Sequence, residues 1–544
     1  MRSFFAFYCM CQIFLGGLEL NSRRNWISAI FALVLTLLIG LGINTNNAQA
    51  SSTLKIGMEA NYAPYNWTQT TKANGAVPID GTNSYANGYD VKIAKIIGKK
   101  LHRKVVVEKT QWDGLLPALT SGKIDLIIAG MSPTAERRKA INFSTPYRTT
   151  NFVVIVNKQS KYASAKYLSD FKGAKLTAQQ GTLHYNLIKQ LPGAKREPAS
   201  KDFSAMRESL EAGTIDGYVA EDTELTSFKM VDKNITGVNL SKMKGLKVSA
   251  TDAEVSIGVK KGNDKLLNQV NQILAGVSNK KRTQLMKDAV HQQPQTNTKK
   301  ENWFVSMMKN YGGMILEGVG MTLLISLVGT VAGFFIGLLV GIVRTTPKPK
   351  NKVKSALLSF FKWLLSVYVE VFRGTPMMVQ AAVIYYGIAQ FWHINLNRTA
   401  AALIIVSINT GAYLAEVIRG GIISTPKGQF EAASALGMTH NQRMWNIILP
   451  QAIRNCLPSI TNEFIVNIKD TSVLSIISVS ELFFVGSTIA SQSFQFFQTY
   501  LVISAIYLFL TFTITRIFNA IEKHIEGPKN YNLMANQVQV GQDK

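Results

Sequence analysis

The 544-residue sequence is short of cysteine and of acidic residues, and it lacks the motifs of several enzyme classes. Its three cysteines (Cys9, Cys11 and Cys456) are too few and too scattered for a disulfide framework or a zinc cluster. The nucleotide-binding pattern G-x-x-x-x-G-K-[ST] is absent, because Pro117 stands where Gly122-Lys123 would need an upstream glycine. We found no metal-ligand spacing and no nucleophile–base motif. The sequence therefore predicts a chain that is not an enzyme and holds no cofactor or metal of its own.

Charge is distributed unevenly along the chain. Residues 51–290 carry 36 Lys+Arg against 21 Asp+Glu, whereas residues 301–544 carry 18 against 11 and contain long uncharged runs. These two unlike halves exclude both a single soluble globule and a disordered chain. The net charge of +26 contains no basic block or arm, and much of it lies beside apolar runs, so we expect no nucleic-acid partner.

The N-terminal segment has the parts of an export signal. Arg23 and Arg24 precede an apolar run over residues 27–43, and Ala48-Gln-Ala50 follows it. We therefore expect residues 1–50 to be an N-terminal extension and signal peptide, and the domain after it to lie outside the cell. At 17 residues the run is at the short limit for a membrane span, so an uncleaved anchor is the alternative.

Residues 51–290 read as two α/β lobes. Residues 54–58 predict a first strand, Asp90 is placed to N-cap a helix, and residues 124–131 form an apolar run of parallel-strand character. Two β-rich runs, 152–156 and 255–259, predict two crossings between the lobes. The expected lobes are 51–154 with 255–290, and 155–254. Two lobes joined by two strands can close about a ligand.

Several motifs in this half resemble one protein family. They are Gly88-Tyr-Asp90, Trp112-Asp-Gly-Leu-Leu-Pro-Ala-Leu119, Gly122-Lys-Ile-Asp125, Ala129-Gly-Met-Ser132, Glu136-Arg137 and Ile141-Asn-Phe-Ser-Thr-Pro-Tyr147. Together they resemble the extracellular solute-binding proteins for polar amino acids, over residues 53–288. The resemblance implies a two-lobed periplasmic-binding-protein-like α/β fold.

The resemblance also implies a ligand site. It puts Arg137 on the ligand's carboxylate, which the planar guanidinium suits, and Asp222 on the ammonium. Tyr62 and Trp112 match an aromatic pair that sandwiches the side chain. The remaining implied ligand-binding residues are Glu59 at the side chain's far end, Gly130, Ser132, and Gln180, Gly181 and Thr182 at the start of a helix in the second lobe. Pro133 departs from the family pattern and removes one N–H near the ligand.

Glu59 bears on the choice of substrate. An ionised carboxylate accepts hydrogen bonds but donates none, so it favours an amide or a cation and disfavours glutamate and aspartate. We expect a glutamine-type ligand, the commonest assignment for this fused architecture. A basic amino acid (arginine, lysine or histidine) is the alternative.

The second half reads as a membrane domain. Residues 291–301 are a polar linker, residues 302–525 hold the spans, and residues 526–544 form a tail. We expect about five transmembrane helices, over Gly318–Val343, Gly374–Asn397, Thr399–Ala415, about 460–480, and Leu482–Thr515. Five basic residues between Arg344 and Lys354 mark the cytoplasmic side, so the first half lies outside and the C-terminus inside.

A loop after the third predicted span carries the most specific motif of the chain. Its fixed positions are Glu431, Ala432, Ala433, Gly437, Ile447, Leu449 and Pro450. This pattern resembles the EAA loop of ABC importer permeases, and residues 368–380 and 469–472 resemble the polar amino acid subgroup. The resemblance implies a type I permease fold in the cell membrane, working as a homodimer with two copies of a separate ATPase, which binds the ATP. An amino-acid-gated channel and a dehydratase-like enzyme are alternatives from other classes, and the fusion to a permease argues against both.

Overall fold

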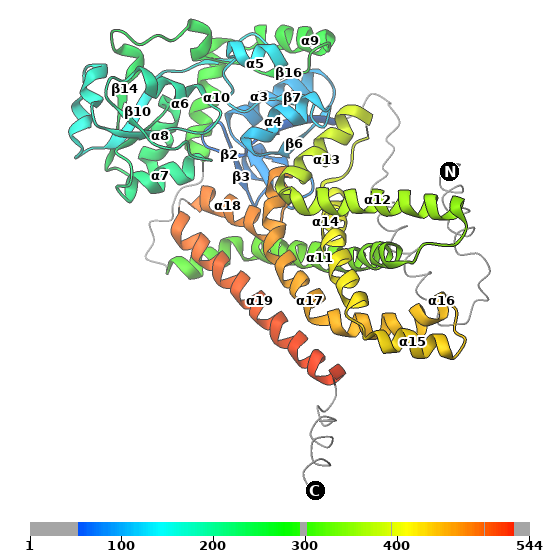
Figure 1. The fold of residues 1–544 in the computed structure, drawn as a ribbon. Coiled ribbons are helices and arrows are strands. Elements are labelled where there is room, and N and C mark those ends of the chain that lie inside the picture. The colour runs from blue at the N-terminus through cyan, green and yellow to red at the C-terminus, as the bar shows by residue number, and fades with distance from the viewer. Residues whose placement is uncertain (1–52, 294–301, 393, 494, 527–544) are drawn as a thin grey trace. The chain divides into compact units, whose positions relative to one another are not determined.

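The computed structural model describes residues 53–293, 302–392, 394–493 and 495–526 (Figure 1). The predicted signal peptide lies outside these residues, as do most of the predicted linker and almost all of the tail. The described chain has an α/β half up to residue 293 and a helical half from residue 302.

A five-stranded sheet forms the centre of the first lobe, in the order β6-β1-β7-β16-β8. Its strands are β1 (Thr53–Met58), β6 (Lys104–Lys109), β7 (Leu126–Ile127), β8 (Asn142–Phe143) and β16 (Gly258–Val259). β1 pairs parallel with β6 and β7, and β16 pairs antiparallel with β7 and β8. Leu54, Ile56 and Met58 are completely buried, which fits the central place of β1. A smaller antiparallel sheet, β2 (Asn61–Tyr62), β3 (Asn66–Gln69), β5 (Tyr85–Asn87) and β4 (Val77–Pro78), follows β1 in the chain.

The second lobe has its own five-stranded sheet, in the order β12-β11-β13-β10-β14. Its strands are β10 (Phe152–Asn157), β11 (Lys175–Thr177), β12 (Lys195–Arg196), β13 (Gly217–Glu221) and β14 (Ile235–Asn239). β10 pairs antiparallel with β13 and β14. Phe152, Val154 and Val219 pack in the core of this lobe.

The chain crosses between the lobes where β9 (Arg148–Thr149) pairs antiparallel with β15 (Glu254–Val255). The sequence placed the first crossing near residue 154. The structure places it a few residues earlier, because β10 belongs entirely to the second sheet.

Helices and short 3₁₀ turns connect the strands of the two lobes. The helices are α3 (Tyr89–Lys100), α4 (Trp112–Thr120), α5 (Ala135–Ala140), α6 (Leu183–Leu187), α7 (Phe203–Glu211), α8 (Asp222–Val231), α9 (Asp264–Ala275) and α10 (Asn279–Gln292). The turns are η1 (Ala73–Gly75), η2 (Lys161–Ser164), η3 (Leu168–Phe171), η4 (Ile188–Gln190), η5 (Leu240–Lys242) and η6 (Ala250–Ala253).

Asp90 does not cap α3, contrary to the sequence prediction. Gly88 is the N-cap, in a backbone conformation with φ +128° that glycine adopts readily. Asp90 lies in the first turn and is fully buried, where it accepts hydrogen bonds from Asn66 (2.8 Å) and from the hydroxyl of Tyr147 (2.7 Å). It therefore ties three segments of the first lobe together.

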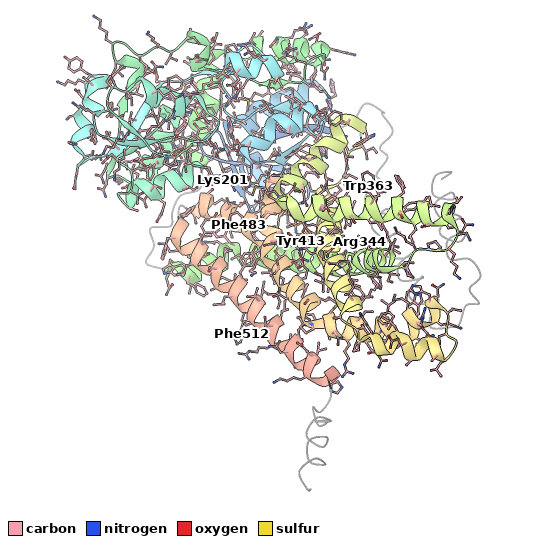
Figure 2. All side chains as sticks on the ribbon, in the orientation of Figure 1. Lys201, Arg344, Trp363, Tyr413, Phe483 and Phe512 are labelled. Atoms are coloured by element: carbon pink, nitrogen blue, oxygen red, sulfur yellow. The ribbon has the colours of Figure 1, made fainter. Side chains whose placement is uncertain are left out.

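The second half is helical throughout its described residues. Its elements are α11 (Trp303–Thr345), α12 (Lys352–Gly374), α13 (Met377–Trp392), α14 (Arg398–Ile423), α15 (Lys427–Ala435), α16 (His440–Arg443), the π-helical η7 (Met444–Ile448), α17 (Leu449–Asp470), the 3₁₀ turn η8 (Thr471–Ile477), α18 (Leu482–Ser493) and α19 (Phe496–Glu526). Within the described ranges, four helices are long and apolar enough to cross a membrane, or up to five if the bent pair ending in α18 is one span. Trp363 on α12 and Phe512 on α19 are 60% and 57% exposed, as expected of lipid-facing side chains (Figure 2).

The predicted spans do not all match the helices of the structure: the span expected over about 460–480, for example, crosses from α17 into η8. α12 is itself a span-length helix, whereas the predicted span over 374–397 contains only the 16-residue α13. The apolar run 482–515 is not one helix, because it divides between α18 and α19.

α11 and α14 pack with their backbones in close contact. Gly329, Gly333, Gly337 and Gly341 recur every four residues along one face of α11. A Cβ atom on Gly333 would lie 2.7 Å from Thr410, and one on Gly337 would lie 2.8 Å from the backbone nitrogen of Ala415. We call this contact the glycine seam. Small residues at this spacing let membrane helices approach closely.

Candidate ligand-binding cleft and coupling loop

A small cavity lies between the two lobes. Its volume is about 20 Å³, room for about one water molecule, so the lobes are closed on each other. It is lined by Glu59, Tyr62, Trp112, Gly130, Ser132, Arg137, Gln179, Thr182, Leu183, His184, Phe203 and Glu221. Seven of the ten predicted ligand-binding residues are in this set. Gln180, Gly181 and Asp222 are not.

Arg137 reaches across the cleft from the first lobe. It lies in α5, whose N-cap Thr134 accepts a hydrogen bond from the Arg137 backbone. Its guanidinium donates to the carbonyl oxygen of Ser132 (2.9 Å) and to that of Gly181 in the second lobe (3.0 Å), and it lies 5.0 Å from the centre of the Trp112 ring. Burial lowers the pKa of Arg137 to about 10, so the group stays charged at neutral pH.

His184 provides an uncharged wall next to this guanidinium. Burial, and to a smaller extent the charge of Arg137, lowers the pKa of His184 to about 4. The ring is therefore neutral at physiological pH and adds no second positive charge beside Arg137.

The acidic residue that lines the cavity is one position before the predicted Asp222. Glu221, the last residue of β13, lines the cavity and is 1% exposed. Asp222 instead accepts hydrogen bonds from Thr150 (3.2 Å) and Asn151 (2.9 Å) at the crossing between the lobes. Burial, with a contribution from the charge of Asp222, raises the pKa of Glu221 to about 7.

Tyr62 stacks on an aromatic ring of the second lobe. Tyr62 and Trp112 both line the cavity, as their predicted place beside the ligand requires. Tyr62 stacks on Tyr65 of its own lobe and on Phe203, the first residue of α7 in the second lobe. The ring centres of Tyr62 and Phe203 are 4.5 Å apart and the planes differ by 8°. Trp112 faces Arg137. No signal in the sequence marked Phe203, because its partner comes from the other lobe.

Glu59 of the first lobe forms a hydrogen bond with the second lobe at the cavity. Its carboxyl accepts a hydrogen bond from the side chain of Gln179 in the second lobe (3.1 Å). Burial raises the pKa of Glu59 to about 8, partly offset by this hydrogen bond and by Lys109. The sequence argument treated Glu59 as ionised, whereas in the closed cleft its protonated form prevails at neutral pH.

Gln180 and Gly181 lie beside the cavity without lining it. Gln180 is exposed, and Gln179 is the buried member of this glutamine pair. Gly181 has φ +69° and contributes the carbonyl oxygen that accepts from Arg137. Thr182 precedes α6 as its N-cap, and its hydroxyl donates to the carbonyl of Gln179 (2.6 Å).

The predicted EAA residues form a helix, a turn and a second helix. α15 ends at Ala435, and Gly437 follows its C-cap with φ +72°. The backbone N–H of Gly437 donates to the carbonyl of Ser434 (3.0 Å), and that of Met438 donates to the carbonyl of Ala433 (3.2 Å). This is the Schellman arrangement, which needs a left-handed residue. Thr439 then starts α16 with a capping box. The turn is therefore fixed by its local sequence.

One side of this loop is buried and the other is exposed. Ile447 and Leu449 pack against α11 and α14, and Pro450 is in the first turn of α17. Glu431 and Ala432 are exposed, and Leu436 is 79% exposed. The packed side therefore holds the loop on α11 and α14 and leaves Leu436 on its outer side.

Comparison with known proteins identifies both halves. Residues 54–290 match the model of the bacterial extracellular solute-binding proteins, family 3, and residues 353–527 match that of the binding-protein-dependent transport system inner membrane component. The glutamine transport system permease protein GlnP of Escherichia coli strain K12 is 34% identical over 218 residues, which cover 39% of this chain and 93% of the relative. The chain belongs to this family of transport permeases.

Other members of the permease family are similar to the same half. The arginine transport system permease protein ArtQ of Bacillus subtilis strain 168 is 30% identical, over 39% of this chain and 92% of the relative. For the solute-binding half, the structure of an ancestral arginine-binding protein bound to glutamine is 29% identical, covering 44% of this chain and 98% of that one, with a TM-score of 0.37.

The two family matches confirm the predicted fold class and the fusion of a solute-binding domain to a permease domain. The chain is a multi-pass membrane protein and a component of a transport system, not an enzyme.

Proposed function

We propose that this chain is the receptor and permease subunit of an ATP-driven importer for a polar amino acid. One observation carries the proposal: the closed cleft places Arg137 of one lobe and Glu221 of the other around a single small cavity. A free amino acid carries a carboxylate and an ammonium on one carbon, and these two side chains match them. Each charge comes from a different lobe, so the ligand stabilises closure.

Within this class we propose a glutamine-type ligand. At neutral pH the protonated Glu59 donates a hydrogen bond to an amide oxygen without any change of charge. A cationic side chain would first have to draw a proton from it. Glutamine also names the Escherichia coli relative. A basic amino acid is the alternative, since the Bacillus subtilis relative is named for arginine.

The proposed route to the membrane domain starts at Glu59. A second cavity, of about 50 Å³, is lined by Glu59 and Trp112 of the cleft and by Phe484, Ser487 and Thr488 of α18. Glu59 and Trp112 line both cavities, so the side of the cleft next to Glu59 faces the permease half. We propose that the ligand leaves its cleft on this side.

The proposed partners are a second copy of this chain and two copies of a separate ATPase, which binds the ATP. The exposed Leu436 beside the turn at Gly437 supports an ATPase contact at the EAA loop. The basic residues between Arg344 and Lys354 support the proposal that this loop is cytoplasmic and that the solute-binding domain lies outside the cell.

Calorimetry and uptake with two neighbouring variants test the ligand site. Glu221→Gln removes the charge proposed to hold the ammonium, so we expect the affinity for glutamine to fall about ten- to a hundredfold. Asp222→Asn is the matched control, because its side chain is bonded outside the cavity, and its affinity should stay within threefold of wild type. The reverse pattern would restore the original assignment of Asp222. A full-length protein that binds none of the twenty amino acids would refute the proposed function.

A further inference from the structure

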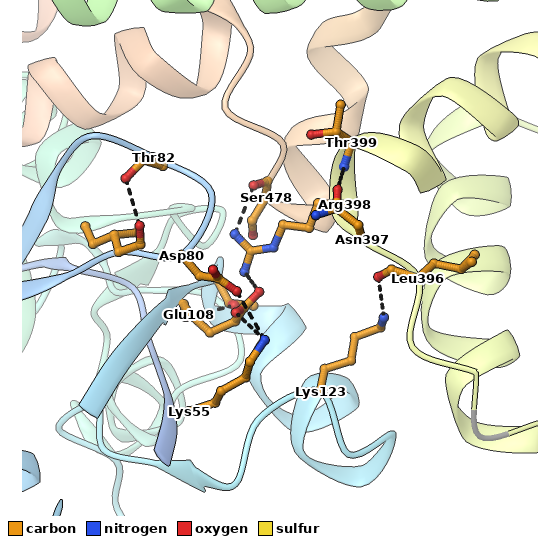
Figure 3. A network of polar contacts seen from close by, with 12 residues as sticks. Lys55, Asp80, Thr82, Glu108, Lys123, Leu396, Asn397, Arg398, Thr399 and Ser478 are labelled. Carbon is orange, nitrogen blue, oxygen red and sulfur yellow. Dashed lines mark hydrogen bonds and ion pairs between the residues drawn. The ribbon is translucent and has the colours of Figure 1, made fainter. Parts of the chain in front are cut away.

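The first lobe contacts the membrane half through a buried ion pair (Figure 3). Arg398, the first residue of α14, pairs with Glu108 at the end of β6, and both side chains are more than 85% buried. Arg398 also donates to the carbonyl oxygen of Ser478 (3.2 Å). On the lobe side, Lys55 lies 3.8 Å from Glu108 and 3.1 Å from Asp80. The four charged groups balance, two positive and two negative.

Two lysines of the same lobe add further contacts. The buried Lys109 donates to Asn61 (2.9 Å) and Thr68 (3.1 Å) of its own lobe and to Thr488 on α18 (2.6 Å). Lys123 donates to the carbonyl oxygen of Leu396 (3.4 Å), and its ammonium lies 3.5 Å from the centre of the Tyr385 ring.

The second lobe contacts the membrane half differently. Ser204 of α7 donates to Ser491 of α18 (2.9 Å), and the exposed Lys201 lies 5.5 Å from the centre of the Phe483 ring (Figure 2). Separating these groups leaves hydroxyls and an ammonium that water can reach. Separating Glu108 from Arg398 would leave two charges that must be rehydrated together.

We propose that the first lobe is a fixed anchor on the permease, held in register by Glu108 and Arg398, and that the second lobe is the one that swings during capture and release. This inference rests on the proposed function. Charge pairs of this kind fix orientation more than they add affinity. The two strands at the crossing, β9 and β15, allow the second lobe to move while the first stays docked.

Exchanging the two charges tests the anchor. All variants carry Lys55→Gln, because Lys55 lies 3.8 Å from Glu108 and would repel an arginine there. In this full chain, Glu108→Arg and Arg398→Glu each place like charges together, whereas the double exchange restores an opposite pair. Docking is read without any ligand, as the yield of cross-linking between Asn83→Cys and Glu317→Cys by a short bis-methanethiosulfonate, with the three native cysteines replaced. These two positions are hydrogen-bonded across the same contact (2.6 Å). We expect each single exchange to lower the yield at least tenfold, and the double exchange to return it to within threefold. Unchanged yields in the single exchanges, or no recovery in the double, would overturn the proposal.

A second cross-link tests which lobe moves. Ser204→Cys with Ser491→Cys reports on the second lobe, and the Asn83/Glu317 pair reports on the first. Added glutamine should raise the rate of the Ser204/Ser491 cross-link at least fivefold and change the other by less than twofold. An equal response at both pairs, or a response only at the first lobe, would overturn the proposal. So would no response at either pair in a protein that binds glutamine by calorimetry. Absence of glutamine binding is a failure of the proposed substrate, which calorimetry detects separately, and the charge exchange still decides the anchor.

Discussion

The protonation of Glu59 offers an experiment that separates the two proposed substrate classes. In an open cleft its carboxyl faces water, with a pKa near the ordinary 4.5, and in the closed cleft burial raises the pKa to about 8. At pH 7, closing around a neutral amide therefore takes up close to one proton per ligand. Closing around a cation keeps Glu59 ionised and takes up none.

The proton uptake fixes the sign and size of the pH dependence. A group whose pKa is raised on closure stabilises the closed state fully at low pH, and this stabilisation is lost as the pH rises through the raised pKa. The affinity for glutamine should then fall about tenfold between pH 6 and 7 and about fivefold between pH 7 and 8. For arginine, the affinity should show no such fall.

Calorimetry of the full chain, in buffers that differ in ionisation enthalpy, measures the uptake directly. Glu59→Gln is the matched variant: it keeps the shape and the neighbouring Asp113, Asp202 and Lys109, so any remaining pH dependence belongs to other groups. We expect it to remove the proton uptake with glutamine. Glutamine binding without proton uptake in the wild type, or the same slope in Glu59→Gln, would refute the role of Glu59 given above.

Two further predictions concern the membrane half. Gly437→Asp and Leu436→Asp should leave the affinity for the amino acid unchanged and abolish uptake into proteoliposomes, because each puts a charge on the exposed side of the EAA loop. Leu436 needs no left-handed backbone, so the same loss in both variants would come from lost coupling and not from backbone strain. Uptake near wild type in both variants would contradict the ATPase contact. Gly333→Val should lower the melting temperature of the purified chain by several degrees, because overpacking costs about 1–3 kcal/mol. Gly313→Val is the control, since it lies on the same helix with open space around it. Equal melting temperatures of the two variants would argue against the glycine seam.

The two misplaced cleft residues show what the sequence could not decide. Gln179 and Gln180 are neighbours of the same type, and so are Glu221 and Asp222. Glu221 ends β13 and Asp222 begins α8, and Gln179 forms a bridge just before a turn that starts at Gln180, so the residue that faces the cleft depends on where each extended segment ends. The sequence located both segments to within one residue of the cavity lining. Only the pairing of β13 with its neighbours determines which carboxylate lines the cavity.

Hydropathy had a similar limit in the membrane half. α12 contains Glu370 and several basic residues at its start, so no long uncharged run marks it, although its length and composition allow it to span. The run 482–515 has no charge to show where α18 ends and α19 begins. The EAA loop depends on local features: a left-handed glycine at Gly437 and an N-cap at Thr439, which the sequence shows directly.

The glycine seam has a consequence for how the two ends of the molecule communicate. α14 begins at Arg398, which holds the first lobe, and ends at Ile423, four residues before the helix of the EAA loop. Over its 26 residues it measures roughly 39 Å. At Gly333 and Gly337 of the seam a Cβ atom would lie within 3.0 Å of the backbone of α14, so the two helices have little room to shift against each other there. α14 is therefore built as a stiff rod, and a tilt imposed where the receptor sits must reappear at the loop where the ATPase is proposed to bind.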